Sequence, residues 1–599
     1  MSSSTPPVIA RLAAALQASP LDGEALQSVL SQHLDDEAVA ALRAMAEFRE
    51  DRYVRLSLHR TRDVELRLLC WGPGQSSGLH DHGEASCAFR VLAGRATEVR
   101  LGRPDRLLAA GDVGEAAPGV VHNVLNTGTG ALVTLHVYAP PLPVDQPSTE
   151  AGLRVVIVGG GFSGVAAAMH LLKRGDAGLR VTLVEPGPGL GQGVAYGTAD
   201  RTHVLNVPAA GMSWDPEDPG DFLRYARSRG IAAGPRSLLS RALYAEYTAD
   251  RLADAVRHAA GRLRVVRGRV VAVEPSAEGG HRVALADGTV LPAAHVVLAT
   301  GHGEQVLPQG LAGLSGDARF HANPWECHVQ TGLPLDARLL LVGTGLTALD
   351  LLGTLRRAGH RGQVDVVSLT GRWPKPHLPS VVWTGDPPAI DTPPTPATAD
   401  ALAGWLRASF QQADAAGAPW QAVMEALRPR TAALWASMSD AEQQRFLTVW
   451  RPQWERLRHR APLAQIAAVT DWEASGWVHR RAGSPVSARV LPDGALSVVT
   501  AHDGQTHEHT VDHVILCTGA ISDPRALGDP WPGLLAQGSV TPHPLGVVTD
   551  EAGAVLRDGV PVPGLWAAGG LLRPRFFEVT AVPDIARRSE RLAKSILES

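Results

Sequence analysis

A glycine-rich turn between an apolar strand and an apolar helix constrains this chain more than any other feature. The strand-like stretch 154–158 leads into residues 159–164, with the sequence GGGFSG, which open the helix-forming stretch 165–172. Glycines at this spacing permit a tight turn and let a pyrophosphate approach the backbone at a helix N-terminus. Glu185 ends the next strand, where a carboxylate can accept a ribose hydroxyl. The predicted dinucleotide contacts are Gly159, Gly161, Phe162, Ser163, Gly164 and Glu185.

A second turn of the same kind begins another strand–helix unit. The stretch 337–342 leads into GTGLTA at 343–348, followed by the helix-forming stretch 349–355. Its next strand has no terminal acid, and Ser368, Thr370 and Arg372 stand there instead. A hydroxyl and a guanidinium favour a 2′-phosphate, so NADPH is expected rather than NADH, although Arg372 can also be read as a solvated turn residue. The predicted contacts are Gly343, Gly345, Leu346, Thr347 and Arg372.

Strands that end in small residues recur in the C-terminal three quarters of the chain. The predicted nucleotide contacts at these ends are Thr300, Gly301, Gly519 and Gly569. Strands alternate with helices here, which predicts parallel sheets covered by helices on both faces. The stretch 152–599 resembles FAD/NAD(P)-binding proteins related to flavin-dependent N-hydroxylases and monooxygenases, chiefly at 189–209, 458–462 and 576–584. That resemblance implies bound FAD and NADPH.

The chain before residue 142 shows a different pattern of predicted secondary structure. Short amphipathic helices precede several short strand-like pieces, which predicts an antiparallel β-barrel. A proline-rich stretch then separates this N-terminal region from the region of alternating strands and helices. The expected architecture is therefore multidomain, with a β-barrel followed by an α/β flavoprotein that binds two dinucleotides. The predicted divisions are a barrel domain with N-terminal helices at 1–142, a linker at 143–151, an FAD-binding domain at 152–335 and 470–599, and an NAD(P)-binding domain with a helical insertion at 336–469.

Three histidines in the N-terminal domain form a candidate metal site. His80 and His82 are two residues apart, which puts both imidazoles on one face of a strand, and His122 lies in another strand-like stretch. Three neutral imidazoles suit a divalent first-row metal. No cysteine lies beside the pair to suggest structural zinc.

These histidines stand where the chain resembles the cupins, and within them the cysteine dioxygenase family. The match covers about residues 45–142, through the motifs YVR at 53–55, CWGPG at 70–74, HDH at 80–82, PGVVHN at 118–123 and LHVYAPP at 135–141. A typical cupin carries a glutamate ligand four or five residues after the HxH pair, where this chain has Ser86 and Cys87. The resemblance implies an Fe(II) site of three histidines without a carboxylate.

The same resemblance implies roles for four further residues. Arg55 would clamp a substrate carboxylate, Tyr138 would place a phenol near the iron, and His136 would orient that phenol. Cys87 matches the family position that can form a thioether with the tyrosine. The plainer alternatives are a surface role for Arg55 and a core-packing role for Cys87.

Composition excludes several functional classes. A net charge of −4 argues against a nucleic-acid partner, and four cysteines without a CxxC pair exclude a disulfide scaffold and argue against a disulfide reductase. The N-terminal segment lacks the pattern of a signal peptide, and no apolar run is long enough to span a membrane, so we expect a cytoplasmic protein.

The predicted function is that of a bifunctional redox enzyme. An iron-dependent dioxygenase would convert cysteine or a related thiol amino acid to a sulfinate with O2. A fused FAD- and NADPH-dependent monooxygenase would oxygenate nitrogen or sulfur in the product or in the same amino acid. Two alternatives remain open: the flavin half is a reductase or oxidase, or the N-terminal domain is a ligand sensor.

Overall fold

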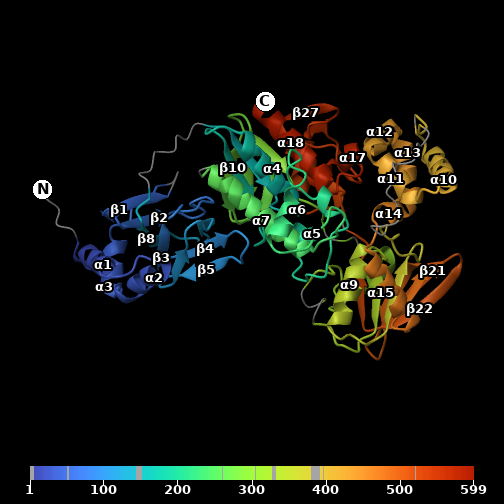
Figure 1. Cartoon of the computed structure of the whole chain (residues 1–599), viewed down its shortest axis with the longest axis horizontal. Coiled ribbons are helices and arrows are strands. Elements are labelled where there is room, and N and C mark those ends of the chain that lie inside the picture. Colours follow the sequence, from blue (N-terminus) through green and yellow to red (C-terminus); the bar gives the residue numbers. More distant parts are fainter. Residues whose placement is uncertain are drawn as a thin grey trace.

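The computed structural model describes residues 6–49, 53–142, 152–259, 261–303, 305, 307–326, 329, 332–378, 392–395, 397–519 and 521–599. Figure 1 shows the N-terminal domain at one end of the long axis and a sheet-and-helix domain in the middle. A second sheet and a group of helices lie at the other end. The predicted linker at 143–151 lies outside the described residues.

The N-terminal domain consists of two antiparallel sheets with three helices on one outer face. The larger sheet has the order β1-β2-β8-β3-β6 and the smaller β5-β4-β7. Residues of both sheets, including Trp71, Phe89 and Val124, share one core, and the helices cover the opposite face of the larger sheet. The predicted β-rich fold is confirmed as this pair of facing sheets. Its elements are α1 (Pro7–Gln17), α2 (Gly23–Gln32), α3 (Asp36–Arg43), β1 (Val54–Arg60), β2 (Glu65–Trp71), β3 (Ser86–Ala93), β4 (Arg95–Arg100), β5 (Arg106–Ala109), β6 (Val113–Ala116), β7 (His122–Asn126) and β8 (Leu132–Ala139).

The central domain contains a six-stranded sheet in the order β11-β10-β9-β15-β27-β26, in which only the β26–β27 pair is antiparallel. This confirms the predicted parallel sheet. A small antiparallel sheet, β12-β13-β14, accompanies it. The elements are β9 (Arg154–Val158), α4 (Phe162–Arg174), β10 (Arg180–Val184), α5 (Gly193–Tyr196), α6 (Asp221–Ser228), α7 (Arg241–His258), β11 (Leu263–Val266), β12 (Val270–Pro275), β13 (His281–Leu285), β14 (Val290–Ala293), β15 (His295–Leu298), α16 (Trp531–Ala536), β24 (Pro542–His543), β25 (Gly546–Val547), β26 (Ala554–Arg557), β27 (Val560–Ala567), α17 (Arg573–Phe576) and α18 (Val582–Glu598).

The second sheet, β16-β23-β17-β18-β19, is parallel throughout. Strand β19 completes the edge beside β18, with Val478 opposite Val364, and β23 pairs with β17. Three strands of this sheet, β16, β19 and β23, therefore lie outside residues 336–469, the range predicted from the sequence for the NAD(P)-binding domain. The elements here are β16 (Phe320–His321), β17 (Leu339–Val342), α9 (Leu346–Arg357), β18 (Val364–Ser368), α15 (Leu463–Ala474), β19 (Val478–Ala482), the antiparallel β20 (Ser484–Val490), β21 (Leu496–His502) and β22 (Gln505–Val511), and β23 (His513–Leu516).

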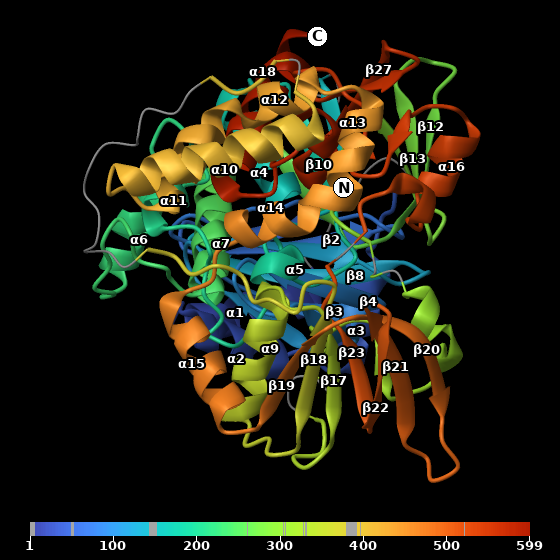
Figure 2. The same ribbon diagram turned by 90° about the vertical axis from the view of Figure 1, so that its right-hand side faces the viewer.

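A helical insertion lies between β18 and β19 and packs on the C-terminal part of the central domain. Its elements are α10 (Ala399–Ala415), α11 (Trp420–Leu427), α12 (Thr431–Ser437), α13 (Asp440–Arg445) and α14 (Arg451–Arg458). In Figure 2 these helices lie above the second sheet. Their core includes Leu545 and Phe577 of the central domain, so the insertion and that domain share one apolar cluster.

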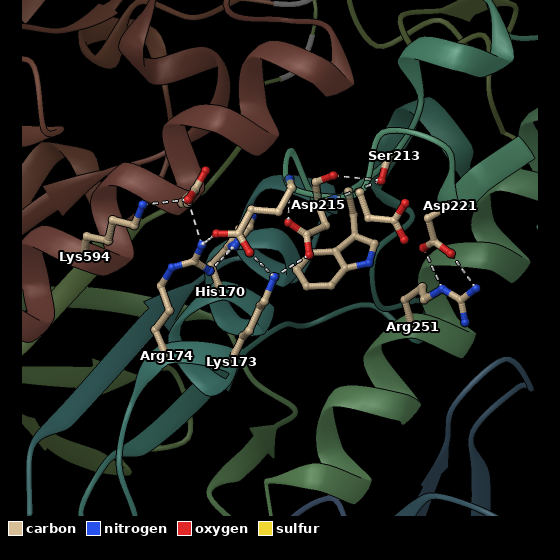
Figure 3. Close-up of polar contacts among 12 residues, drawn as sticks. His170, Lys173, Arg174, Ser213, Asp215, Asp221, Arg251 and Lys594 are labelled. Atoms are coloured by element: carbon tan, nitrogen blue, oxygen red, sulfur yellow. Dashed lines mark hydrogen bonds and ion pairs between the residues drawn. The ribbon is translucent and has the colours of Figure 1, made fainter. Parts of the chain in front are cut away.

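Ion pairs fasten the segment 213–221 to its neighbours in the central domain (Figure 3). Lys173, in the last turn of α4, lies 2.6 Å from Asp215, and Arg174 lies 2.7 Å from Glu590 of α18. Arg251 of α7 contacts both oxygens of Asp221 at 2.8 Å. Networks of this kind hold their geometry better than isolated surface pairs.

The N-terminal domain docks against β11, the edge strand of the central sheet. The Leu79 amide donates to the Leu263 carbonyl at 3.1 Å, and the Asn123 side chain donates to the Val265 carbonyl at 2.9 Å. Arg267, just after β11, lies 2.9 Å from Asp105 of the N-terminal domain. These contacts fix the loop that carries the first two histidines to the dinucleotide-binding domain. Among the described residues, no helix is both long and apolar enough to cross a membrane.

Candidate metal centre and nucleotide sites

The three predicted metal ligands converge on one point. The Nε2 atom of His82 lies 3.2 Å from that of His80 and 3.4 Å from that of His122. These ligand atoms all lie within 4.8 Å of one another. Burial, and then the neighbouring His122, lowers the pKa of His80 to about 3, and burial also lowers the pKa of His82 strongly. Both imidazoles are therefore neutral at ordinary pH, which is the form that binds a metal.

Backbone and side-chain partners hold these imidazoles in position. The amide of each of His80 and His122 donates to the other's carbonyl at 2.9 Å, so the loop pairs with the first residue of β7. The Nδ1 atom of His80 lies 2.9 Å from the Gly78 carbonyl, and that of His122 lies 2.8 Å from the carboxylate of Glu98. A second partner of this kind fixes ring orientation and raises ligand basicity. The donor set therefore fits a divalent metal.

Glu98 was missed by the sequence analysis. It lies on β4 and is completely buried, in contact with His122 and Arg106. The signal in the sequence is a single carboxylate inside the short strand 95–100, which would be costly to bury without partners. Its partners come from β5 and β7, distant in the sequence, so only the folded structure reveals the pairing.

Tyr138, His136 and Cys87 lie beside the three histidines, as the sequence predicted. Cys87 of β3 stands directly opposite Tyr138 of β8 in the sheet, and its Sγ lies 4.0 Å from Nδ1 of His136. The Tyr138 hydroxyl lies 3.2 Å from Nδ1 of His136, and its ring centroid lies 5.1 Å from that of His82. Burial raises the pKa of both Cys87 and Tyr138, so each keeps its proton.

Arg55 lies on β1 at the edge of this group. It is exposed, and its guanidinium carbon lies 5.2 Å from the centre of the Tyr53 ring. Its charge acts on His80 and on Tyr138, so it lies near the metal centre. Arg67, which is buried and paired with Glu65 at 2.8 Å, also approaches the Tyr138 ring, and the sequence analysis missed it.

The first glycine-rich turn forms a backbone cradle at the carboxyl ends of β9 and β10. Gly159 has a φ of 107°, and a Cβ there would lie 2.3 Å from the Ala299 carbonyl oxygen. The Glu185 carboxylate accepts hydrogen bonds from the amides of Gly160 and Gly187 at 2.7 and 2.8 Å. Gly161 caps α4, so Phe162, Ser163 and Gly164 form its first turn. This geometry fits a dinucleotide diphosphate.

Three further predicted contacts lie close to this cradle. Thr300 follows β15, the strand beside β9, and its Oγ1 is buried without a hydrogen-bond partner among the described residues. Gly301 follows it with a φ of 69°. At Gly569, after β27, a Cβ would lie 2.2 Å from Oγ of Ser163. The parallel strands thus bring four segments distant in the sequence to one edge of the sheet.

The second glycine-rich turn has the same form. Gly343 has a φ of 122°, and a Cβ there would lie 2.3 Å from the Cys517 carbonyl oxygen. Gly345 caps α9, so Leu346 and Thr347 begin that helix. Gly519 follows the adjacent strand β23 with a φ of 86°. The cradle fits a second dinucleotide.

Arginines gather at the end of β18, where a ribose of that dinucleotide would lie. Arg372 is exposed there. Burial, and then the charges of Arg372 and Arg480, lowers the pKa of Arg456. The guanidinium of Arg480 also stacks 5.6 Å from the Trp373 ring. The sequence analysis found only Arg372, because Arg456 comes from the helical insertion and Arg480 from β19.

A cavity of about 1100 Å³ lies between the central domain and the helical insertion. Its walls include Asn206, Arg236, His377, Arg460 and Glu578. No motif in the sequence predicted it, since its walls come from six separate stretches of the chain, 206–211, 236–238, 377–378, 421–432, 458–463 and 578–588.

Comparisons with known proteins agree with this division of the chain. Residues 1–147 match the family model for cysteine dioxygenase type I, and residues 156–303 match an FAD-NAD(P)-binding family model. Cysteine dioxygenase type 1 from Danio rerio is 32% identical over 111 residues, which are 16% of this chain and 55% of that protein. The enzyme from Rattus norvegicus is 30% identical over 132 residues, 20% of this chain and 65% of that protein. The chain thus spans less than two thirds of the length of these relatives.

Solved flavoprotein structures resemble the remainder of the chain. The cadaverine monooxygenase of desferrioxamine biosynthesis from Erwinia amylovora has a TM-score of 0.53 at 15% identity, covering 75% of this chain and 95% of that one. An ornithine N-hydroxylase from Kutzneria sp. 744 has a TM-score of 0.50 at 15% identity, covering 74% and 99%. At these identities the likeness establishes the fold.

The comparisons confirm both resemblances found in the sequence. The N-terminal domain is cysteine dioxygenase-like, and the remainder has an FAD- and NAD(P)-binding fold. Together with the three-histidine centre, they support the predicted cofactors, which are Fe(II), FAD and NADPH.

We predict that Glu98→Gln weakens iron binding by about 10- to 100-fold, the usual effect of removing such a partner of a ligating histidine. Iron content after dialysis against a graded chelator would measure the change. Glu115→Gln, an exposed glutamate on β6, is the control and should retain iron. Unchanged iron binding in Glu98→Gln would contradict a role for this carboxylate in holding His122.

A second prediction concerns the arginine cluster. Arg372→Ala and Arg456→Ala should each raise the KM for NADPH by about 10-fold or more, because a hydrogen bond to a charged group contributes about 1.5–3 kcal/mol. The KM for NADH should hardly change, since NADH lacks the 2′-phosphate. Arg361→Ala, an exposed arginine beyond α9, is the control. A wild-type preference for NADH would refute the assignment.

Proposed function

We propose that this chain, which joins a cysteine dioxygenase-like domain to an FAD- and NAD(P)-binding module, catalyses two successive oxygenations of a thiol amino acid. The N-terminal domain would form a sulfinate from cysteine or a close relative. The flavin module would then oxygenate that product, or the amine of the same amino acid. The single observation that carries the proposal is the convergence of three imidazoles beside Tyr138 and Arg55.

The residues around the metal centre support the first reaction. Iron, when bound to the three histidines, would offer open positions for a thiolate, an amine and O2. Arg55 carries a permanent charge near His80 and can bind the substrate carboxylate in bidentate fashion. Tyr138 keeps its proton and can donate it to an oxygen atom bound nearby, while His136 accepts from or donates to its hydroxyl. Both atoms of O2 pass to sulfur, and the thiol proton is released.

The residues of the flavin module support the second reaction. FAD and NADPH, when bound, would supply the two electrons that O2 activation requires. The turn at Gly159 and the turn at Gly343 would hold the two diphosphates, and Glu185 would bind the FAD ribose. One atom of O2 is transferred to sulfur or nitrogen. The other leaves as water, with two electrons and a proton from NADPH and one proton from solvent.

The arrangement of the domains bears on transfer between the two reactions. The N-terminal domain contacts β11 at one edge of the central sheet, while the large cavity lies between the central domain and the helical insertion. In Figure 1 the N-terminal domain and the helical insertion lie on opposite sides of the central domain. We therefore propose that an intermediate released at the metal centre reaches the flavin through solvent.

A prediction tests the role of Arg55. Arg55→Ala should raise the KM for cysteine by about tenfold or more, because a charged hydrogen bond contributes about 1.5–3 kcal/mol. A thiol without a carboxylate should hardly respond, and Arg62→Ala, which alters a fully exposed arginine beside β1, should behave as wild type. Sulfinate formation measured for both thiols would decide the matter. Equal losses for the two substrates would assign Arg55 a structural role.

Another prediction tests the link between the two reactions. In full-length protein carrying His82→Ala, which removes a metal ligand, NADPH oxidation should rise on addition of cysteine or of cysteine sulfinate. An oxygenated product should accumulate, identified by mass spectrometry. If neither compound raises NADPH consumption above its background, the flavin half is a reductase or oxidase with another substrate.

A further inference from the structure

The large cavity is bordered by segments that resemble those of flavin-dependent monooxygenases. One wall is the segment 206–211, and another is formed by Glu578, Thr580 and Ala581. Both walls adjoin or fall within stretches that resemble flavin-dependent monooxygenases, 189–209 and 576–584. Neither glycine-rich turn lines the cavity, so the two dinucleotide diphosphates would lie elsewhere. Charged groups in the cavity are therefore available to another ligand.

Arginines outnumber carboxylates in the lining of the cavity. Six arginines and three carboxylates line it. The two histidines in the lining add no positive charge, because burial lowers the pKa of His377 to about 4 and also lowers the pKa of His459. A cleft lined by one sign of charge raises the local concentration of ligands of the opposite sign. An anion is thus the ligand class that the cavity favours.

Three buried polar atoms of the lining have no hydrogen-bond partner among the described residues. They are Nε of Arg460, Nε2 of His377 and Oε1 of Gln421. Arg460 is only 9% exposed and Gln421 only 6% exposed. Buried polar groups in folded proteins are nearly always paired, so three such atoms around one cavity indicate a missing ligand.

Arg460 differs from its neighbour Arg458 in this respect. Arg458 donates from Nε to Glu578 at 3.0 Å, and Glu578 also accepts from the Trp454 indole at 2.9 Å. Arg460 pairs with Glu425 through Nη2 alone, and Glu425 is half exposed. The Nε–H group of Arg460 therefore remains free to bind a ligand.

The wall that carries Glu578 is held firmly by aromatic packing. Phe577 has a φ of 39°, an unfavourable value for a residue other than glycine, and its ring stacks on Trp435 at 4.5 Å between centroids. Such a conformation persists only where surrounding contacts impose it. The insertion thus fixes the shape of the cavity before a ligand binds.

We propose that Arg460, with His377, binds the acidic group that distinguishes the substrate of the flavin module, and that this substrate carries two anionic groups. An amino acid sulfinate, with its carboxylate and sulfinate, meets that requirement, whereas cysteine carries one carboxylate. The inference rests on the proposed function, since it selects between the two substrates named there. It makes the product of the first reaction the ligand of the second site.

The test is equilibrium binding to full-length, FAD-loaded, iron-free protein, measured by calorimetry and by the flavin difference spectrum. The probes are L-cysteine sulfinate and L-cysteine. Wild type should bind the sulfinate more tightly, and Arg460→Gln should weaken its binding by about 10- to 100-fold, the range expected for a charged hydrogen bond. Binding of cysteine should change far less. Arg430→Gln, an exposed arginine of the same insertion outside the cavity, is the control.

Gln421→Glu keeps the size of the side chain but adds a negative charge, and it should also weaken binding of the sulfinate. This variant decides the matter if Arg460→Gln fails to retain FAD. The inference is overturned if wild type does not bind the sulfinate or if neither variant weakens that binding. It is also overturned if the variants weaken the binding of the sulfinate and of cysteine equally. Binding that depends on Arg460 without NADPH turnover would instead count against the proposed reaction and leave the anion site standing.

Discussion

The edge strand β11 is the element on which the arrangement of this molecule depends. A parallel sheet leaves unpaired backbone groups at its edge, and an uncovered edge promotes aggregation. Here the N-terminal domain covers that edge, through the Leu79 amide and the Asn123 side chain. Because Leu79 directly precedes His80, the same contacts that protect the sheet also support the loop of the metal centre. The two halves of the chain are therefore joined by these contacts as well as by the polypeptide.

The two candidate sites differ in how completely their buried charged groups are paired. At the metal centre, the charge of buried Glu98 is paired, because its carboxylate contacts both His122 and Arg106. In the large cavity, pairing is incomplete, and an arginine that is nine-tenths buried retains an unused donor. The first arrangement suits a resident metal, while the second suits a ligand that arrives and leaves.

Local patterns in the sequence were sufficient to predict much of this. The turn at 159–164 acts within a few residues, so its spacing alone predicted its geometry. His80 and His82 were predicted on one face of a strand but lie in a loop, and the backbone pairing of His80 with His122 helps to bring the three imidazoles together. Glu98, Arg456 and Arg460 were missed because their partners lie on other elements, and a single charged residue in a strand or helix carries no such information. Strand β19 pairs with β18 although it lies beyond residue 469, because strand order depends on pairing between distant segments.

The central domain is discontinuous, and this has a consequence for how the protein is made. Strand β27 belongs to the same sheet as β9, and helix α18 belongs to the same domain. The whole second sheet and the helical insertion lie between β15 and β27 in the sequence, so they are translated before this domain is complete. Domains generally fold as units, from the N-terminus first, during synthesis. The N-terminal domain can thus be complete while the partner sheet still lacks a strand. On the ribosome, β11 would receive its covering domain before the flavin cradle closes, so early docking would shield an unfinished sheet.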